Sequence, residues 1–338
     1  MVSDPARQVR ELLYGQLLSR ALQAFAVLGV ADELGDVVKS LDVLAERVGA
    51  RPEPLRRLLR ALAAFEVLVE PEPDHFGLAV LGHALRSDAP GSALPTALLA
   101  TGEVGQAWDQ LLETVRSGRP GFERAFGTSF FGYLELKPGL RTMFDRSQES
   151  GLRAELPDIL RAVDLADGTV VDVGGGDGAL LAGVLSAAPG LRGVLVDRQD
   201  AVAAARRRFE AADMAHRCEA RIGDFFGPWP EGAEIYLLRH VLHDWEDERC
   251  AALLRGGRRV MAPGSRLLVV EFAHARRGES GPDARTAALM DLYMLSLFDG
   301  GRERTIAELV GLLDAAGLMV DSIAPLPTGA VVINARKG

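Results

Sequence analysis

A glycine-rich loop carries the first chemical signal in the sequence. Residues 170–181 read VVDVGGGDGALL, a short apolar run and an aspartate followed by four glycines within five residues. Between a predicted strand and a predicted helix, glycines adopt positive φ and let a ligand reach backbone amides. The next predicted strand ends at Asp197, 21 residues after Gly176, where a carboxylate can accept hydrogen bonds from both hydroxyls of a ribose. The loop therefore predicts a nucleotide-like ligand, and Gly174 to Ala179 also satisfy the weak dinucleotide pattern G-x-G-x-x-A.

Three features favour S-adenosylmethionine over a dinucleotide. Asp172 precedes the glycines, and its carboxylate would repel a pyrophosphate but attract a ligand that carries an ammonium and a sulfonium. A simpler role for Asp172, capping the loop through backbone amides, stays open. The segment GDFF places Asp224 where it can accept from the adenine amine and Phe225 where it can pack on the ring. The loop also lies in the middle of the chain, behind a long helical region.

The elements around this loop predict a doubly wound α/β sheet. From about residue 165, apolar runs alternate with helical stretches: GTVVDVG, LRGVLVD, CEARIGDFF, AEIYLLRHVLHDW and SRLLVVEF are the expected strands. Such alternation is typical of a parallel sheet with helices on both faces, which binds ligands at the carboxyl ends of its strands. A helix near residues 306–316 and the strand GAVVINARK are expected to close the sheet.

The region before residue 155 predicts helices and a dimer interface. The stretch VRELLYGQLLSRALQAFAVLGVADEL is apolar on more than one face, which at a chain terminus indicates burial against a second subunit. Two helices over residues 40–68 and a hairpin in LVEPEPDHFGLA then form a winged-helix pattern. This pattern also occurs in DNA-binding proteins. The net charge of −9, from 38 basic and 47 acidic residues, disfavours nucleic acid and membrane surfaces as partners.

Cysteine usage and hydropathy indicate a cytoplasmic protein. Cys218 and Cys250 form no CxxC pair, which excludes a disulfide scaffold and a zinc ribbon. The N-terminal residues show no signal-peptide pattern, and no apolar run reaches the length of a membrane span. A length of 338 residues suits two domains.

Four motifs in a fixed order resemble one family. DVGGGDG, GDFF, LRHVLHDWED and GGRER are similar to those of the small-molecule O-methyltransferases, a class with plant caffeic acid enzymes and actinobacterial enzymes that tailor aromatic polyketides. The resemblance covers essentially the whole chain. It implies a homodimer with a winged-helix-like dimerisation domain over 1–100, a helical linker that contributes to the substrate pocket over 101–160, and a Rossmann-like cofactor domain over 161–338.

The resemblance also implies the catalytic residues. His243 of HDW matches the general base, and a histidine suits proton removal from a phenol near neutral pH. Glu271 and Glu303 match the glutamates that flank that histidine and would fix its tautomer. Arg239 matches the position that contacts the cofactor end of the site. For Glu303, an ordinary acidic residue before a helix is the alternative.

His240 lies three residues before His243, a spacing that metal-binding histidine pairs also use. No third ligand has a convincing spacing in the sequence, so we expect no metal.

The acceptor pocket is expected between the helix before the glycine loop and the segment before GGRER, as in the resembled enzymes. The candidate lining residues are Met143, Phe144, Asp291, Met294 and Phe298. Methionine and aromatic side chains suit a flat aromatic acceptor, although they also suit ordinary core packing. The segment SLFDGG departs from the Asn-Pro of the plant enzymes, which favours a polyketide-like phenol over a phenylpropanoid. Two alternatives remain: a relative that uses the bound cofactor for hydroxylation, decarboxylation or a pericyclic reaction, and, more remotely, a DNA-binding regulator.

Overall fold

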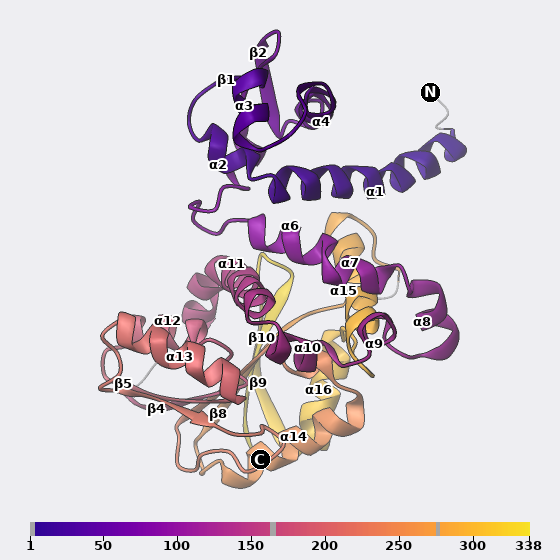
Figure 1. Ribbon diagram of the computed structural model, residues 1–338. Helices are drawn as coiled ribbons and strands as arrows, with labels where there is room; N and C mark the ends of the chain where they lie inside the picture. Colours follow the sequence, from indigo (N-terminus) through magenta and orange to yellow (C-terminus); the bar gives the residue numbers. More distant parts are fainter. Residues whose placement is uncertain (1–3, 163–166, 275–277) are drawn as a thin grey trace. The chain divides into compact units, whose positions relative to one another are not determined.

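The computed structural model describes residues 4–162, 167–274 and 278–338, and the chain divides into two compact units. The first unit comprises Met1–Gln106 with Pro138–Ser150, and the second comprises Ala107–Lys137 with Gly151–Gly338. Figure 1 shows the elements of each unit. Among the described residues, no helix combines the length and apolarity needed to cross a membrane.

The second unit is built on a seven-stranded sheet in the order β6-β5-β4-β7-β8-β10-β9. Its strands are β4 (Gly168–Val173), β5 (Leu191–Asp197), β6 (Cys218–Ile222), β7 (Ile235–Arg239), β8 (Arg266–Phe272), β9 (Leu318–Pro325) and β10 (Ala330–Lys337). The five strands from β4 to β8 pair in parallel, so their carboxyl ends, and the residues that follow them, meet at one edge. The predicted doubly wound fold is confirmed.

Helices cover both faces of this sheet. One apolar core joins the sheet to α12 (Ala179–Ala187), α13 (Gln199–Ala211) and the carboxyl half of α11 (Pro138–Ala162). The other core joins it to α14 (Asp247–Val260) and α16 (Ile306–Ala315). The remaining helical elements of the unit are α8 (Leu111–Ser117), α9 (Gly121–Phe126), α10 (Phe130–Leu136), η1 (Leu242–Asp244) and α15 (Pro282–Leu297).

The last two strands correct the expectation of a wholly parallel sheet. β10 lies between β8 and β9 and runs antiparallel to both. Only the short turn after Pro325 separates β9 from β10, and a connection of that length joins antiparallel strands, whereas parallel strands need a long crossover.

The first unit has the predicted winged-helix pattern. It contains α1 (Pro5–Val27), α2 (Val30–Leu34), β1 (Lys39–Ser40), α3 (Leu41–Arg47), α4 (Pro52–Ala63), β2 (Leu68–Glu72), β3 (His75–Leu78), α5 (Val80–His83) and α6 (Leu94–Thr101), and α7 (Glu103–Trp108) begins here. The helix α4 presents arginines, but Arg56 is paired with Asp74 and Arg60 with Glu70. These pairs neutralise two of the charges on which a DNA-binding interpretation would depend.

Candidate active site

The glycine loop and the end of β5 form one structure. The backbone N–H of Gly176 donates to Asp197 Oδ2 at 2.7 Å, so the acid predicted to bind a ribose lies against the loop. Gly174 has φ +72°, and a Cβ there would lie 3.0 Å from Val241 and 3.5 Å from the Phe225 ring. The loop therefore needs glycine at this position, and Phe225 lies beside it as the motif order predicted.

Asp172 is a buried carboxylate with spare acceptor capacity. It is 1 % exposed, and within the described part of the chain its Oδ2 atom has no hydrogen-bond partner. Burial, together with the nearby carboxylate of Asp197, raises the pKa of Asp172 to about 7. Asp224, after β6, accepts the backbone N–H of Phe226 at 2.9 Å through Oδ1. These carboxylates fit a cationic ligand that also carries an adenine, because each offers an acceptor close to the loop.

The turn that carries His243 is fastened from two sides. It follows β7 and contains the 3-10 helix η1. Glu271, at the end of β8, accepts the backbone N–H groups of Val241 at 3.0 Å and Leu242 at 2.7 Å. On the other side, the buried Arg304 donates to the carbonyls of Leu242 at 2.8 Å and Trp245 at 2.6 Å. The position of the imidazole is therefore set by two buried charged groups.

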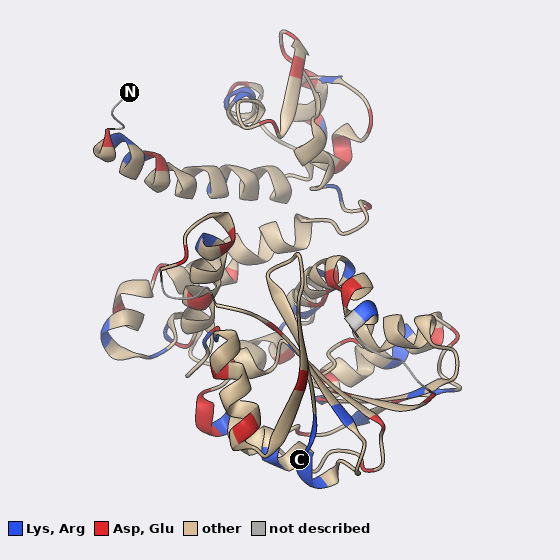
Figure 2. Ribbon diagram, turned by 180° about the vertical axis from the view of Figure 1, so that it is seen from behind, with Lys and Arg blue, Asp and Glu red and all other residues tan. Residues whose placement is uncertain are grey.

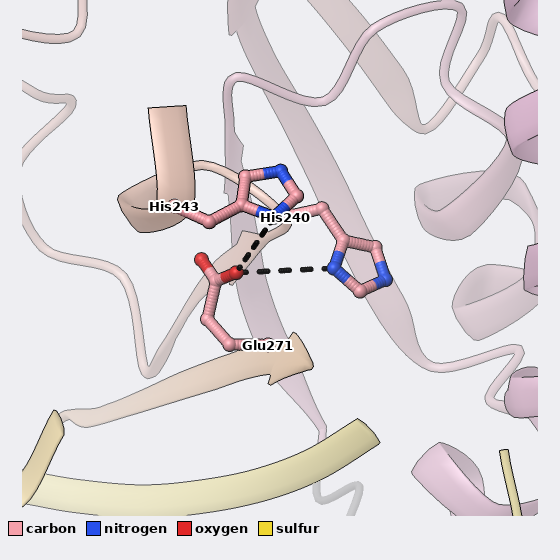
Figure 3. A group of neighbouring side chains, drawn as sticks. All are labelled: His240, His243 and Glu271. Carbon is pink, nitrogen blue, oxygen red and sulfur yellow. Dashed lines mark ion pairs between the residues drawn. The ribbon is translucent and has the colours of Figure 1, made fainter. Parts of the chain in front are cut away.

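Carboxylates surround His243. Its Nδ1 atom lies 3.1 Å from Glu303 Oε1 and 3.7 Å from Glu271 Oε2, and its Nε2 atom lies 3.5 Å from Asp244 Oδ1. Figure 3 shows Glu271 between His243 and His240. Burial on its own would lower the pKa of His243, but the charges of Glu271 and Glu303 outweigh it and raise the pKa to about 10. An Nδ1–H directed at Glu303 leaves Nε2 as the nitrogen that can exchange a proton with an acceptor.

A second buried cluster lies beside this turn. Glu155, on α11, accepts from Arg239 Nη2 at 2.7 Å and Nε at 2.8 Å, and it contacts His240 Nε2 at 3.3 Å. Burial opposes its ionisation, but His240 and Arg239 together lower the pKa of Glu155 to about 2. Arg239 thus reaches the sheet edge as predicted, but with its guanidinium already paired.

The predicted acceptor residues fall into two groups. Asp291 Oδ1 accepts the backbone N–H of Glu303 at 2.9 Å, so this residue helps to hold the loop that carries Glu303. Phe298 packs against Phe131, with ring centroids 5.4 Å apart, and Met294 is buried. Met143 and Phe144 lie on the part of α11 that belongs to the first unit.

A cavity of about 1020 Å³ adjoins Glu303. Phe272 and His274 line it after β8, and Met290 lines it from α15. Thr305, the N-cap of α16, also lines it; its side chain and Glu308 form a capping box that fixes the start of the helix directly after Glu303.

Sequence reasoning missed Glu155, Asp244 and Arg304. Asp244 lies in the HDW motif and Arg304 in GGRER. The motifs therefore included both residues, but residue type alone did not indicate a role for either of them. Glu155 lies in a helical stretch without a motif, and only the fold brings it next to Arg239.

Comparison with known proteins identifies the family. Residues 10–85 match the family model for an O-methyltransferase dimerisation domain and residues 108–319 that for an O-methyltransferase domain. The chain is 46% identical to the O-methyltransferase SfmM3 of Streptomyces lavendulae over 332 residues, 97% of this chain and 99% of the relative. Its structure is similar to LaPhzM, with a TM-score of 0.92, 34% identity, and coverage of 99% of this chain and 100% of that one.

A second similar structure was solved with ligands. The O-methyltransferase NcsB1 from neocarzinostatin biosynthesis, in complex with S-adenosylmethionine and 2-hydroxy-5-methyl naphthoic acid, has a TM-score of 0.82 and 33% identity, and the alignment covers 95% of this chain and 96% of that one. These matches confirm the resemblance that the four motifs predicted. The chain belongs to the O-methyltransferase family, and its O-methyltransferase domain follows a dimerisation domain of the same family.

Proposed function

We propose that this protein transfers the methyl group of S-adenosylmethionine to a hydroxyl of an aromatic small molecule in secondary-metabolite biosynthesis. The observation that carries this function is the buried His243, held through Nδ1 by Glu303 at the edge of a methyltransferase sheet. SfmM3 and NcsB1 are O-methyltransferases, and NcsB1 was solved with a naphthoic acid.

The residues at the glycine loop fit the cofactor. Asp197 would hold the ribose, Asp224 and Phe225 the adenine, and Asp172 the ammonium group, with Arg239 at the same end of the site. Gly174 and Gly176 leave room for the cofactor against the backbone. The bound cofactor supplies an activated methyl group, so the chain has to orient two molecules and remove one proton.

His243 is suited to a phenol. Its pKa of about 10 is close to that of an ordinary phenol, so the neutral imidazole can take the phenol proton at little cost in free energy; this neutral form is a minority at neutral pH and increases as the pH rises. An aromatic amine attacks through its lone pair and needs no prior deprotonation, so this cluster of carboxylates around an imidazole favours a hydroxyl. Glu303 and Glu271 then stabilise the imidazolium that forms.

Three side chains of the second unit are proposed to line the acceptor pocket: Met294 and Phe298 would form its wall, with Asp291 at its polar end. Met143 and Phe144 belong to the first unit and stay candidates on the family resemblance alone. An apolar pocket with few polar groups suits a flat aromatic ring.

A labelled-methyl assay tests the proposed function. With S-adenosylmethionine carrying a labelled methyl group, 3-amino-4-hydroxybenzoate and 1,4-dihydroxy-2-naphthoic acid serve as probes, since relatives are named for or were solved with these compounds. We expect label in a methyl ether and one S-adenosylhomocysteine per ether formed. Label on the amine would contradict the choice of oxygen. Cofactor-dependent conversion of a probe without labelled product would support the non-methylating alternative instead.

The helix α1 is proposed to form the core of a homodimer. Leu12, Leu13, Tyr14 and Leu17 are all more than half exposed, although this stretch contains no charged residue between Glu11 and Arg20. In Figure 2 the middle of the α1 ribbon is tan, the colour of residues other than Lys, Arg, Asp and Glu. Contiguous exposed apolar side chains indicate a binding surface, and the match to a dimerisation domain makes a second copy of this chain the partner.

Changing Leu13 and Leu17 to Glu is expected to produce a monomer. These side chains are about two-thirds exposed in the single chain, so the helix should keep its fold while the apolar surface is lost. Light scattering after gel filtration would measure the mass. The matched control is Ile222→Glu, which changes an equally exposed apolar residue on the edge strand β6 and should remain dimeric. If the double variant stays dimeric, α1 does not form the dimer interface.

A further inference from the structure

Three side chains at the sheet edge are arranged like the ligands of a metal ion. His240, His243 and Glu271 each bring one ligand atom within 4.8 Å of the other two. Figure 3 shows the three side chains, with Glu271 joined to both histidines by dashed ion pairs. The His240 Nδ1 atom lies 3.8 Å and the His243 Nδ1 atom 3.7 Å from Glu271 Oε2. Two ligands of a tetrahedral zinc ion lie about 3.4 Å apart, as bond lengths near 2.1 Å require. Small side-chain movements would therefore close the site on an ion.

Two of these ligand atoms lack a hydrogen bond within the part of the chain that the structure describes. Among the described residues, His240 Nδ1 and Glu271 Oε2 are buried and make no hydrogen bond. The side chain of His240 is 7% exposed and that of Glu271 is 2% exposed. Buried polar atoms are nearly always hydrogen-bonded, so a pair of unsatisfied atoms facing each other calls for a ligand between them.

The backbone of His240 is in an uncommon conformation that directs its ring to this place. Its φ is +53°, in the left-handed region that non-glycine residues rarely adopt. As a result, the two imidazoles lie nearly parallel, with centroids 5.5 Å apart, and the His240 ring stacks on Phe272. This conformation places the two histidines on the same side of the turn.

The second nitrogen of each histidine lies next to a carboxylate. His240 Nε2 lies 3.3 Å from Glu155 Oε1, and His243 Nε2 lies 3.5 Å from Asp244 Oδ1. Histidines that bind metals almost always pair their other nitrogen with a carboxylate or a carbonyl, which orients the ring and makes the ligand atom more basic. The carboxylates of Glu155 and Asp244 therefore stand where metal-binding histidines usually have a hydrogen-bond partner.

We propose that His240, His243 and Glu271 bind a zinc-like divalent cation, whose fourth position would be filled by a water molecule. Two nitrogen ligands favour zinc over magnesium or calcium, which prefer oxygen. The third ligand, Glu271, is 28 residues from His243, which is why spacing alone did not predict a metal.

The bound cation would switch off methyl transfer, an effect that rests on the proposed function. A histidine that binds zinc through Nδ1 keeps its remaining proton on Nε2, because the neutral ring has only one. Nε2 then cannot accept a proton from the acceptor. Metal binding and proton removal are therefore mutually exclusive at His243, and zinc acts as a reversible inhibitor and not as a cofactor.

Binding is tested with cobalt(II), which replaces zinc and absorbs visible light when its site is tetrahedral. We expect the metal-free protein to develop this absorption at one cobalt per chain and to lose it when zinc is added. His240→Asn removes one ligand while keeping a residue that tolerates positive φ, and it should weaken cobalt binding at least about tenfold. The matched control is His216→Asn, which removes an exposed histidine and should bind cobalt like the unchanged protein. Failure of the unchanged protein to bind cobalt, or equal binding by His240→Asn, would overturn the site.

Inhibition is measured as the ratio of methyl transfer with zinc to that with a chelator, within each variant, so that a change in basal turnover cancels. Zinc should inhibit the unchanged protein and His216→Asn far more than His240→Asn, and the chelator should restore turnover. If the protein binds cobalt but zinc does not inhibit it, the metal site is supported and the proposed inhibition through His243 is wrong. Cobalt binding in a protein that methylates no phenol would leave the metal site intact and count against the proposed function alone.

Discussion

Arg304→Met is expected to lower the melting temperature by roughly 6–12 °C. The change removes the charged donor of the Leu242 and Trp245 carbonyls, which keep only weaker contacts such as that from the Cys250 thiol, and it breaks the contact with Asp247, at 2.9 Å from Arg304 Nε. Hydrogen bonds from a charged group contribute about 1.5–3 kcal/mol each, so the free energy of unfolding should fall by about 3 kcal/mol. In a unit of this size, each kcal/mol lost from the free energy of unfolding lowers the melting temperature by about 2–4 °C. Thermal unfolding followed by circular dichroism would measure the shift.

The same substitution should reduce methyl transfer beyond its effect on folding. Arg304 holds the turn between β7 and α14, and the carbonyl of His243 accepts from the neighbouring backbone N–H of Arg302 at 2.8 Å. A misplaced turn separates the imidazole from the acceptor. Arg302→Met is the matched control, because Arg302 is 40% exposed and its side chain pairs with Glu308 on the surface. If Arg304→Met and Arg302→Met melt at the same temperature, Arg304 does not hold the turn.

Patterns local in the chain made much of the site predictable. The glycine loop, Asp197 and the order of the strands follow from residue type and periodicity, and the fold then brings Asp197 to the Gly176 amide. His243 and Glu303 were predicted from motifs 60 residues apart, and they lie in hydrogen-bond contact. Strand ends meet at one edge of a parallel sheet, so motifs that follow strands converge whatever their separation in sequence.

Contacts that depend on tertiary packing were not predictable in this way. Glu271 was expected only to flank the histidine, but it also accepts two backbone N–H groups of the His243 turn. Glu155 reaches Arg239 from a helix 84 residues earlier. Periodicity shows which face of a helix is apolar, but it does not show which strand end a buried charge meets. The antiparallel β9 and β10 were missed for a related reason, since an apolar run carries no sign of its direction.

His243→Ala is expected to reduce the rate constant for methyl transfer by about 10³, within the range of 10²–10⁴ that general-base catalysis contributes. The imidazole is the proposed proton acceptor, and the substitution removes its Nε2 atom. Asp172, Asp197 and Asp224, the residues proposed to bind the cofactor, are unchanged. The dissociation constant for S-adenosylmethionine should therefore change by no more than about threefold, far less than the change in the rate constant.

Removing the imidazole also leaves Glu271 and Glu303 buried without their cation, which destabilises the fold. His243→Gln is therefore measured alongside, because its amide can still donate to Glu303 but is not a base. His216→Ala serves as the control for the loss of an exposed histidine. Both His243 variants should bind the cofactor and show the same loss in rate.

The most direct test is the single-turnover rate of label transfer from S-adenosylmethionine to the phenol that the unchanged protein methylates, with a chelator present and cofactor saturating. The account predicts that His243→Ala and His243→Gln both form the methyl ether about 10³ times more slowly, with cofactor binding retained. A His243 variant that binds the cofactor and forms the ether at the unchanged rate would contradict the assignment of His243 as the proton acceptor.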